Sequence, residues 1–275
     1  MLAHANMALR AARRAGQIIV RAMDRVDVLR IEEKQKNDLV SEIDRAAEAA
    51  IIEILHKAYP DHGIIGEESG QAVAARSDTT WIIDPLDGTT NFLHGIPHFS
   101  VSIGCVVRGR LEHGVVLDPV RDEAFIASRG HGAQLNGKRL RVTGRTSLDG
   151  AVIGTGIPYR DVDDHLGAYM AMLEDVTRRC RGIRRAGSAA LDLAYVAAGR
   201  FDGFWELGLK PWDMAAGALL VTEAGGLVSD FVGGDAYLES GNIVCGTPKC
   251  FKALLQTIAP HVTPSMKPAP RTPRA

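Results

Sequence analysis

The chain of 275 residues is 46% hydrophobic, 24% charged and 5% aromatic, which excludes a disordered, collagen-like or short disulfide-stapled protein. Its 32 basic and 33 acidic residues give a formal net charge of -1, so no overall field draws it to nucleic acid or to an anionic membrane. The length fits one large domain or two closely packed ones. Any charge chemistry must therefore be local.

The N-terminal sequence and the cysteines indicate where in the cell the protein is expected to be. Arg10, Arg13 and Arg14 lie within an Ala-rich helical pattern, where a signal peptide needs a continuous apolar stretch and a cleavage site. No apolar run approaches the roughly 20 residues that cross a bilayer. The four cysteines show neither a CxxC pair nor the spacing of a structural zinc site. We therefore expect reduced thiols in a cytoplasmic protein.

The first half of the chain predicts two helices and then a sheet. Helical spacing of apolar residues indicates one helix over about 5–25 and another over about 41–59, which Pro60 ends. Short apolar runs between turns then predict strands. These runs are 63–66, 81–83, 99–107, 113–117, 123–127 and 152–153.

The second half alternates helices with short strands. The periodicity predicts helices near 164–178, 188–198, 211–224 and 248–258, and strands at 203–206, 226–229 and 243–245. We expect a single domain over residues 1–260, with lobes of about 1–150 and 151–260. Five prolines and three basic residues fall within 260–275, so residues 261–275 are expected to be a disordered tail.

The densest chemical signal is the segment Asp84-Pro85-Leu86-Asp87-Gly88-Thr89-Thr90. Two acids at the carboxyl end of an apolar strand face the start of a predicted helix. They can hold a hard cation while the helix N–H groups bind a phosphate. An Asp-Pro-x-Asp-Gly turn with Asp87 as a helix cap explains the segment equally well.

Two further acidic positions favour the metal interpretation. Glu67 and Glu68 follow the strand at 63–66, and Asp213 lies in the first turn of a helix that begins near Pro211. Each has a simpler explanation, a solvated loop for the glutamates and a helix-dipole acid for Asp213. Spacing alone does not show that these sites converge.

Together these motifs resemble the inositol monophosphatase family of Mg²⁺-dependent, lithium-sensitive sugar phosphatases, over about residues 5–260. The resemblance is carried by the stretch from Asp84 to Phe92, by Trp212-Asp213-Met214-Ala215-Ala216-Gly217, and by the later Glu223-Ala224-Gly225-Gly226. The stretch from Gly187 to Arg200 is similar to the bacterial SuhB-type branch of the family.

The resemblance implies a mixed α/β (α+β) fold, a layered αβαβα sandwich of the sugar-phosphatase type. It implies hydrolysis of myo-inositol 1-phosphate and similar polyol monophosphates by a metal-activated water, the activity of an inositol-1(or 4)-monophosphatase. Sister activities on fructose 1,6-bisphosphate, 3′-phosphoadenosine 5′-phosphate or histidinol phosphate remain open. A homodimer is also implied.

The resemblance further implies two or three Mg²⁺ ions per site. Glu67, Asp84 and the Leu86 carbonyl are expected to hold one ion, and Asp84, Asp87 and Asp213 a second. Oxygen-only ligands suit Mg²⁺, and the lack of clustered His or Cys argues against zinc.

The same resemblance assigns the remaining roles. Thr89 is expected to hydrogen-bond the attacking water and Asp44 to orient Thr89, with Glu67 as a third catalytic residue. Asp44 as a plain first-turn helix acid is the alternative. Expected contacts to the substrate come from Leu86, Asp87, Gly88, Thr89, Gly187, Ser188, Ala189, Glu206 and Asp213.

One basic segment is not explained by catalysis. Five arginines fall within eight residues: Arg178, Arg179, Arg181, Arg184 and Arg185. A solvated helix end is the simpler interpretation, since cations suit a helix C-terminus. The alternative is a subunit or macromolecular contact, because the segment leads directly into Gly187-Ser188 and members of the resembled family usually pair through nearby surfaces. The SuhB-type branch is also associated with transcription antitermination and ribosomal RNA maturation. That second role would use the same scaffold without using the catalytic site.

Overall fold

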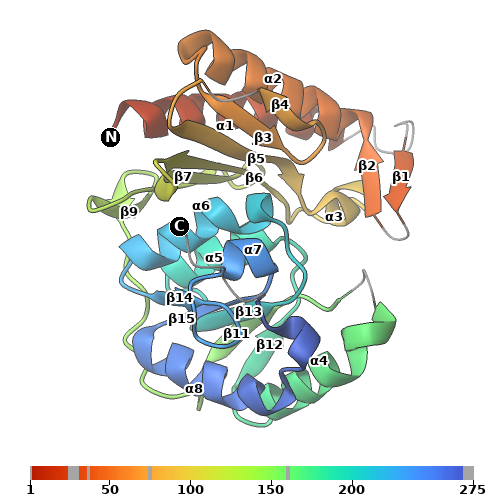
Figure 1. Cartoon of the computed structure of the whole chain (residues 1–275), viewed down its shortest axis with the longest axis vertical. Coiled ribbons are helices and arrows are strands. Elements are labelled where there is room, and N and C mark those ends of the chain that lie inside the picture. The colour runs from red at the N-terminus through yellow and green to blue at the C-terminus, as the bar shows by residue number, and fades with distance from the viewer. Residues whose placement is uncertain (1, 24–30, 36–37, 74–75, 159–161, 269–275) are drawn as a thin grey trace, which may run out of the picture.

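The computed structural model describes residues 2–23, 31–35, 38–73, 76–158 and 162–268. Its α-helices are α1 (Ala3–Ala22), α2 (Glu42–Ala58), α3 (Thr89–Leu93), α4 (Val162–Thr177), α5 (Ala189–Ala197), α6 (Pro211–Glu223), α7 (Tyr237–Ser240) and α8 (Pro248–Ile258). With the strands they stack as five layers (Figure 1): α1 and α2, a large sheet, α5 and α6, a smaller sheet, and α4 and α8. The expected layered mixed α/β fold is confirmed.

The large sheet has eight strands. In spatial order they are β10 (Lys138–Arg139), β9 (Gly132–Leu135), β8 (Glu123–Ser128), β7 (Arg110–Asp118), β6 (Ser100–Val107), β5 (Thr79–Asp87), β3 (Gly63–Gly66) and β4 (Gly70–Val73). Among the strands that the structure describes in this sheet, only β3 and β5 pair in parallel. A separate two-stranded sheet, β1 (Ile31–Gln35) and β2 (Asp38–Ser41), precedes α2. All six apolar runs expected to be strands do form strands, five of them in this sheet.

The outer helix α1 packs on this sheet through small side chains. Its buried face is a run of alanines that includes Ala5, Ala8, Ala12 and Ala15. A Cβ atom added to Gly16 would lie 2.9 Å from the Cβ of Pro119, so a larger residue would push the helix away. Small residues therefore allow a close helix-to-sheet approach. The helix ends at Ala22, before the expected residue 25, and residues 24–30 lie outside the described range.

Strand β5 is longer than expected and carries a bulge. It continues past Ile83 to Asp87, where the sequence predicts a turn. The pairing to β6 is irregular there, since Asp84 lies opposite Ser102 and Asp87 opposite Ser100. An extra residue on one strand bends it, and Pro85 is tolerated because a bulge needs no ladder N–H. Both acids therefore stand on the bulged end of the strand.

Helix α6 lies unusually close to the large sheet. A Cβ atom on Gly104 would lie 2.9 Å from Ala215 Cβ, and one on Gly114 would lie 2.8 Å from the carbonyl oxygen of Ala216. The two glycines thus let the start of α6 rest directly on β6 and β7, which fixes the position of Asp213 relative to β5.

The smaller sheet has five strands. In spatial order they are β12 (Gly182–Arg184), β11 (Val152–Thr155), β13 (Gly203–Glu206), β15 (Ile243–Gly246) and β14 (Leu227–Ser229). The first three run parallel, so their carboxyl ends meet at one edge. One face of this sheet packs on α5 and α6 of the middle layer, whereas α4 and α8 cover the opposite face (Figure 1).

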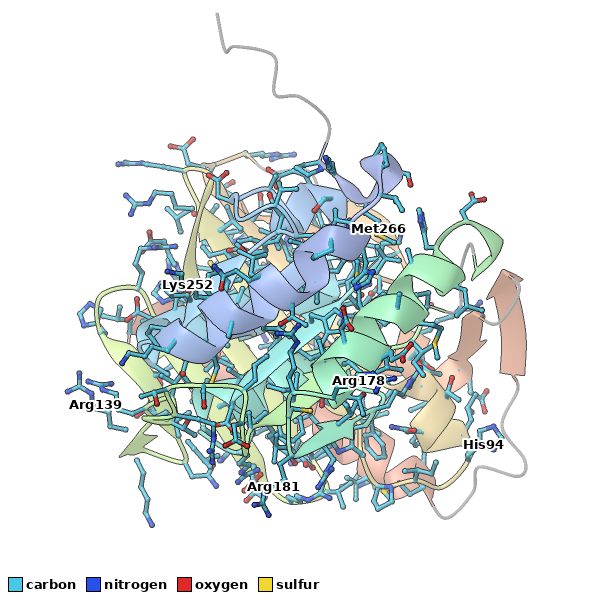
Figure 2. All side chains as sticks on the ribbon, turned by 90° about the horizontal axis from the view of Figure 1, so that it is seen from below. His94, Arg139, Arg178, Arg181, Lys252 and Met266 are labelled. Carbon is cyan, nitrogen blue, oxygen red and sulfur yellow. The ribbon has the colours of Figure 1, made fainter. Side chains whose placement is uncertain are left out.

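The packed chain extends further than the sequence suggests. The 3-10 turns Ala259–His261 and Pro264–Met266 follow α8, and the side chain of Met266 is buried. The Asn242 amide Nδ2 donates to the Met266 carbonyl at 2.7 Å, and His261 Nε2 lies 2.8 Å from Asp175 Oδ2. Figure 2 shows Met266 beside the end of α8. The expected disordered tail is therefore wrong for residues 261–268, because Met266 supplies an apolar anchor; residues 269–275 lie outside the described range.

Among the described residues, no helix is both long enough and apolar enough to cross a membrane.

Candidate functional site

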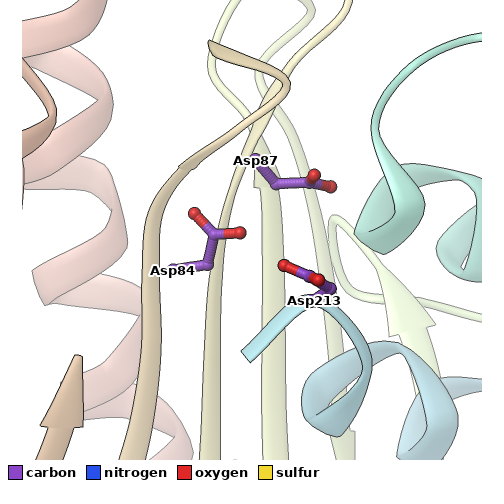
Figure 3. A group of neighbouring side chains, drawn as sticks. All are labelled: Asp84, Asp87 and Asp213. Atoms are coloured by element: carbon purple, nitrogen blue, oxygen red, sulfur yellow. The ribbon is translucent and has the colours of Figure 1, made fainter. Parts of the chain in front are cut away.

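Three carboxylates from distant parts of the chain converge at one point. Asp84 and Asp87 stand on the bulged end of β5, and Asp213 lies in the first turn of α6. One oxygen atom from each carboxylate lies within 4.8 Å of the other two, and Figure 3 shows the three carboxylates around one shared space. This spacing lets a single cation contact all three.

Two of these acids also hold the local fold. Asp213 Oδ2 accepts a hydrogen bond from the Lys210 backbone N–H at 2.7 Å, which closes the first turn of α6. Asp87 Oδ2 accepts from the Ser188 hydroxyl at 2.5 Å and from the Ala190 N–H at 2.7 Å, at the start of α5. Asp87 is therefore a cap, but for a helix 100 residues along the chain and not for α3. Asp87 and Asp213 therefore each close a helix start and also belong to the cluster.

The electrostatics of the cluster call for a cation. Burial, and then the neighbouring carboxylates of Glu67, Asp87 and Asp213, raise the pKa of Asp84 well above its usual value. Burial and Asp213 raise the pKa of Asp87 to about 7, against hydrogen bonds from the start of α5 that lower it. Carboxylates that repel one another this strongly must bind protons or a positive ion. The donor set is oxygen only, so the residues present fit Mg²⁺ or a similar hard cation.

Glu67 reaches the cluster from the neighbouring strand. It follows β3, its N–H donates to the Ile83 carbonyl at 3.0 Å, and its side chain forms a hydrogen bond with Asp84. The loop behind it is held by Glu48, a buried residue of α2, whose carboxylate accepts from the backbone N–H groups of Glu68 and Ser69, each at 2.9 Å. Sequence reasoning missed Glu48. The available signal was its position one helical turn after Asp44, on the same inward face of α2.

Thr89 forms the link between the cluster and α2. Its hydroxyl lies 2.9 Å from Asp44 Oδ1 and 3.1 Å from the Leu86 carbonyl oxygen, so its single proton can be donated to either. Asp44 is buried and lies in the first turn of α2. It is therefore both a first-turn helix acid and the hydrogen-bond partner of Thr89. The Leu86 N–H in turn donates to Asp84 Oδ1 at 2.9 Å.

A pocket of about 320 Å³ reaches from the acid cluster to the ends of β11 and β13 in the smaller sheet. Every site residue expected from the sequence lines it except Asp44, which contacts it through Thr89. The residues that line it are Glu67, Asp84, Leu86, Asp87, Gly88, Thr89, Thr90, Asn91, Thr155, Gly156, Arg185, Gly187, Ser188, Ala189, Asp192, Glu206, Leu209 and Asp213. The pocket therefore has an acidic end on β5 and a second end at the edge of the smaller sheet.

The second end of the pocket combines further acids with one arginine. Burial raises the pKa of Glu206 to about 8, while Arg185 lowers it. Burial also raises the pKa of Asp192 well above its usual value, and Asp192 Oδ1 has no hydrogen-bond partner among the described atoms. Sequence reasoning missed Asp192, which lies in a continuous helical pattern with nothing to distinguish it from a cap.

The five arginines of the 178–185 segment do not form one surface. Arg178 pairs with Glu174 one turn earlier on α4, and the Arg184 guanidinium donates to the Ile183 carbonyl at 3.0 Å. Arg185 lines the pocket. Figure 2 shows Arg178 and Arg181 near the end of α4. The segment divides into a helix end and a pocket residue because β12 lies between them.

The fold and the site together define a metal-dependent phosphatase scaffold. The family model described as "Inositol monophosphatase family" matches residues 3–264, so the chain belongs to this family. Similar relatives carry the name "Nus factor SuhB". The one from Pseudomonas aeruginosa is 62% identical over 265 residues, 95% of this chain and 98% of that protein. The one from Escherichia coli (strain K12) is 50% identical over 262 residues, 95% of this chain and 98% of that protein.

Solved structures agree with this assignment. The SuhB protein from Bartonella henselae superposes with a TM-score of 0.91 at 46% identity, covering 94% of this chain and 98% of that one. An inositol monophosphatase from Anabaena superposes with a TM-score of 0.82 at 35% identity, covering 93% and 94%. The chain is thus of the SuhB type within its family.

Proposed function

We propose that the protein hydrolyses myo-inositol 1-phosphate and similar polyol monophosphates with the help of Mg²⁺. The observation that supports this best is the convergence of Asp84, Asp87 and Asp213 in a pocket shared with Thr89. The membership in a family of phosphatases supports it independently.

The acid cluster would hold the metal ions. Glu67, Asp84 and the Leu86 carbonyl would bind one Mg²⁺, and Asp84, Asp87 and Asp213 a second, with two or three ions in all. Bound Mg²⁺ lowers the pKa of a coordinated water and neutralises charge on the ester oxygen. Asp84 lies between Glu67 and Asp213 and would contribute to both sites, so it should be the least replaceable ligand.

The protein's own groups orient the reaction. When the Thr89 hydroxyl donates its hydrogen bond to Asp44, the lone pairs of its oxygen are free to accept a hydrogen bond from the attacking water, which would orient that water. The N–H groups of Gly88 and Thr89 would bind the phosphate. Gly88 has a left-handed backbone with φ 99°, and an added Cβ would lie 3.0 Å from the Gly187 carbonyl oxygen, so a glycine is required there.

The second end of the pocket would bind the polyol. Glu206 at this end and Asp213 of the acid cluster would offer carboxylates to hydroxyl groups, and the turn before α5 would offer backbone groups of Gly187, Ser188 and Ala189. Leu86 and Asp87 complete the contacts near the phosphate.

A substrate panel tests this function. Phosphate release is measured with Mg²⁺ on myo-inositol 1-phosphate, fructose 1,6-bisphosphate, 3′-phosphoadenosine 5′-phosphate and histidinol phosphate, with and without Li⁺. We expect inositol 1-phosphate to have the highest kcat/KM and Li⁺ to inhibit. A strong preference for a bisphosphate or a nucleotide would contradict the assignment.

A second function on the same scaffold is favoured by the relatives named "Nus factor SuhB". We infer that the protein, as a homodimer in the cytoplasm, also contacts the transcription machinery through the exposed arginines of the 178–185 segment. Arg178, Arg179 and Arg181 are the ones to replace, because Arg185 lines the pocket and its loss would confuse the two functions.

The two functions separate in one experiment. A ribosomal RNA transcription reporter is compared in cells that carry Asp84→Asn or the Arg178, Arg179 and Arg181 to Gln triple variant. Antitermination that survives Asp84→Asn and fails in the triple variant supports an independent contact. Its loss in Asp84→Asn together with phosphatase activity would refute a purely scaffold role.

A further inference from the structure

The second end of the pocket is built from the ends of parallel strands. Thr155, the last residue of β11, lies opposite Trp205 on β13 in the parallel register. The residues that follow them, Gly156 and Glu206, therefore come next to each other at the carboxyl edge of the smaller sheet. Ligands of α/β sheets bind at such edges. Both residues line the pocket.

The carboxylate of Glu206 occupies the space in which a side chain at position 156 would lie. A Cβ atom added to Gly156 would be 1.8 Å from Glu206 Oε1 and 2.0 Å from its carboxyl carbon. The backbone of Gly156 is not in the left-handed region, so torsional strain does not require a glycine there. The lack of a side chain serves to admit the Glu206 carboxylate.

A buried hydrogen-bond network holds the base of this arrangement. The Thr155 hydroxyl lies 2.9 Å from the Trp205 carbonyl oxygen and 2.7 Å from the hydroxyl of Tyr169, a buried residue of α4. The Tyr169 hydroxyl also lies 3.2 Å from the same carbonyl. The peptide group just before Glu206 is thus fixed from two sides, which limits where the carboxylate can go.

We propose that Gly156 is a positioning residue for substrate selection: it lets the Glu206 carboxylate lie across the end of β11, where it accepts a hydrogen bond from a hydroxyl of the leaving polyol. The class of substrate selected is a polyol monophosphate, as opposed to a phosphate ester without a hydroxyl at that position. This inference rests on the proposed function. It adds a residue that neither contacts the phosphate nor binds metal.

The test compares Gly156→Ala with Glu206→Ala and with the double variant. Each is measured for kcat and KM on myo-inositol 1-phosphate and on p-nitrophenyl phosphate, which offers no hydroxyl to Glu206. Gly167→Ala on α4 is the matched control, because a Cβ there meets nothing within 4 Å. In Gly156→Ala the flexible carboxylate of Glu206 must move to make room for the added Cβ, so the protein should still fold.

We expect Gly156→Ala to lower kcat/KM for inositol 1-phosphate by about tenfold, mainly through KM, because the hydrogen bond between Glu206 and the substrate hydroxyl is lost. Hydrolysis of p-nitrophenyl phosphate should change by no more than about twofold. In the Glu206→Ala background, Gly156→Ala should have no further effect, because the two residues act as a unit.

Four results would overturn the inference. The first is a Gly156→Ala variant with unchanged kinetics, and the second is an undiminished effect of Gly156→Ala in the Glu206→Ala background. The others are an equal loss on both substrates, and a failure of Gly156→Ala to fold while Gly167→Ala folds. A wild-type protein that cleaves p-nitrophenyl phosphate but no polyol phosphate contradicts the proposed function itself. A wild-type protein that cleaves both, with an unchanged Gly156→Ala variant, contradicts only the inference.

Discussion

Single acidic residues in this protein close a helix and at the same time belong to the acid cluster. Asp87 closes the start of α5 with one oxygen, and Asp213 closes the first turn of α6. Both nevertheless take part in the cluster with Asp84. A helix cap and a metal ligand are often weighed as alternatives for such residues. Here the cap fixes the rotamer that brings the carboxylate into the cluster, so one task supports the other.

At this scale, Thr89 gives a direct prediction. Thr89→Val keeps the shape of the side chain but removes the hydroxyl that donates to Asp44, so the attacking water loses its orientation. We expect kcat to fall by about a hundredfold or more with KM little changed. Steady-state phosphate release measures both constants.

The matched control is Thr89→Ser, which keeps a hydroxyl and should retain most of the activity. A Thr89→Val enzyme with near-normal kcat would show that this hydroxyl does not orient the water.

The residues that sequence can and cannot identify differ in a physical way. Asp84, Asp87 and Asp213 stand at ends of strands and helices, where local patterns mark them. Glu48 and Gly156 act through neighbours about 20 and 50 positions away, at the Glu68 N–H and the Glu206 carboxylate. Such contacts depend on strand register and helix packing, which a single sequence does not encode locally.

At the scale of elements, the position of α6 decides whether the cluster forms. Gly104 and Gly114 let this helix rest on β6 and β7, and its first turn carries Asp213. The Ser102 hydroxyl also donates to the Trp212 carbonyl at 2.9 Å, which ties the same turn to the sheet. The geometry of the acids is therefore a property of the contact between two layers.

Gly114→Ala tests this contact. The added Cβ would meet backbone atoms of Ala216, which cannot move aside as a side chain can, so α6 must shift. We expect a loss of about 1–3 kcal/mol in the free energy of unfolding, measured by urea denaturation, with reduced activity from a displaced Asp213.

Gly144→Ala serves as the control, because a Cβ there meets nothing within 4 Å. Equal stability of the two variants would mean that the sheet accommodates the methyl group, and that α6 does not depend on this close approach.

The helices α1, α2 and α8 could be predicted from periodicity, since their buried residues recur at helical spacing. The central helices α5 and α6 are instead buried on nearly all sides, so their continuous apolar runs and their length indicate them. The end of β5 could not be predicted. Pro85 normally predicts a turn, and only pairing with Ser100 and Ser102 keeps the chain in the sheet as a bulge. The end of the packed chain was also placed too early, because one buried side chain, Met266, outweighs a Pro-rich composition.

At the scale of the whole molecule, the near-neutral charge hides a separation of charge. Acidic groups gather in one pocket, while arginines such as Arg10, Arg13 and Arg14 lie exposed on α1. Without a cation, the acids of the pocket oppose folding when they ionise. The pKa values of Asp84 and Asp87 are raised by the fold, so the folded state holds protons that the unfolded chain releases. The stability contributed by these protons is therefore lost as pH rises through the raised pKa values, about 7 for Asp87.

Mg²⁺ bound at the cluster would replace those protons, so its stabilising effect should increase over the same window. The most direct test of whether this cluster is the catalytic metal site is the rise in Tm that saturating Mg²⁺ causes. It is measured between about pH 5 and about pH 8 for the wild type and for Asp84→Asn. Phosphate release is followed on the same samples. We predict a rise that grows with pH in the wild type, and in Asp84→Asn a folded protein with a small, flat rise and almost no activity. Equal, pH-independent Mg²⁺ effects in the two proteins, or an active Asp84→Asn variant, would contradict the claim that this cluster is the catalytic metal site.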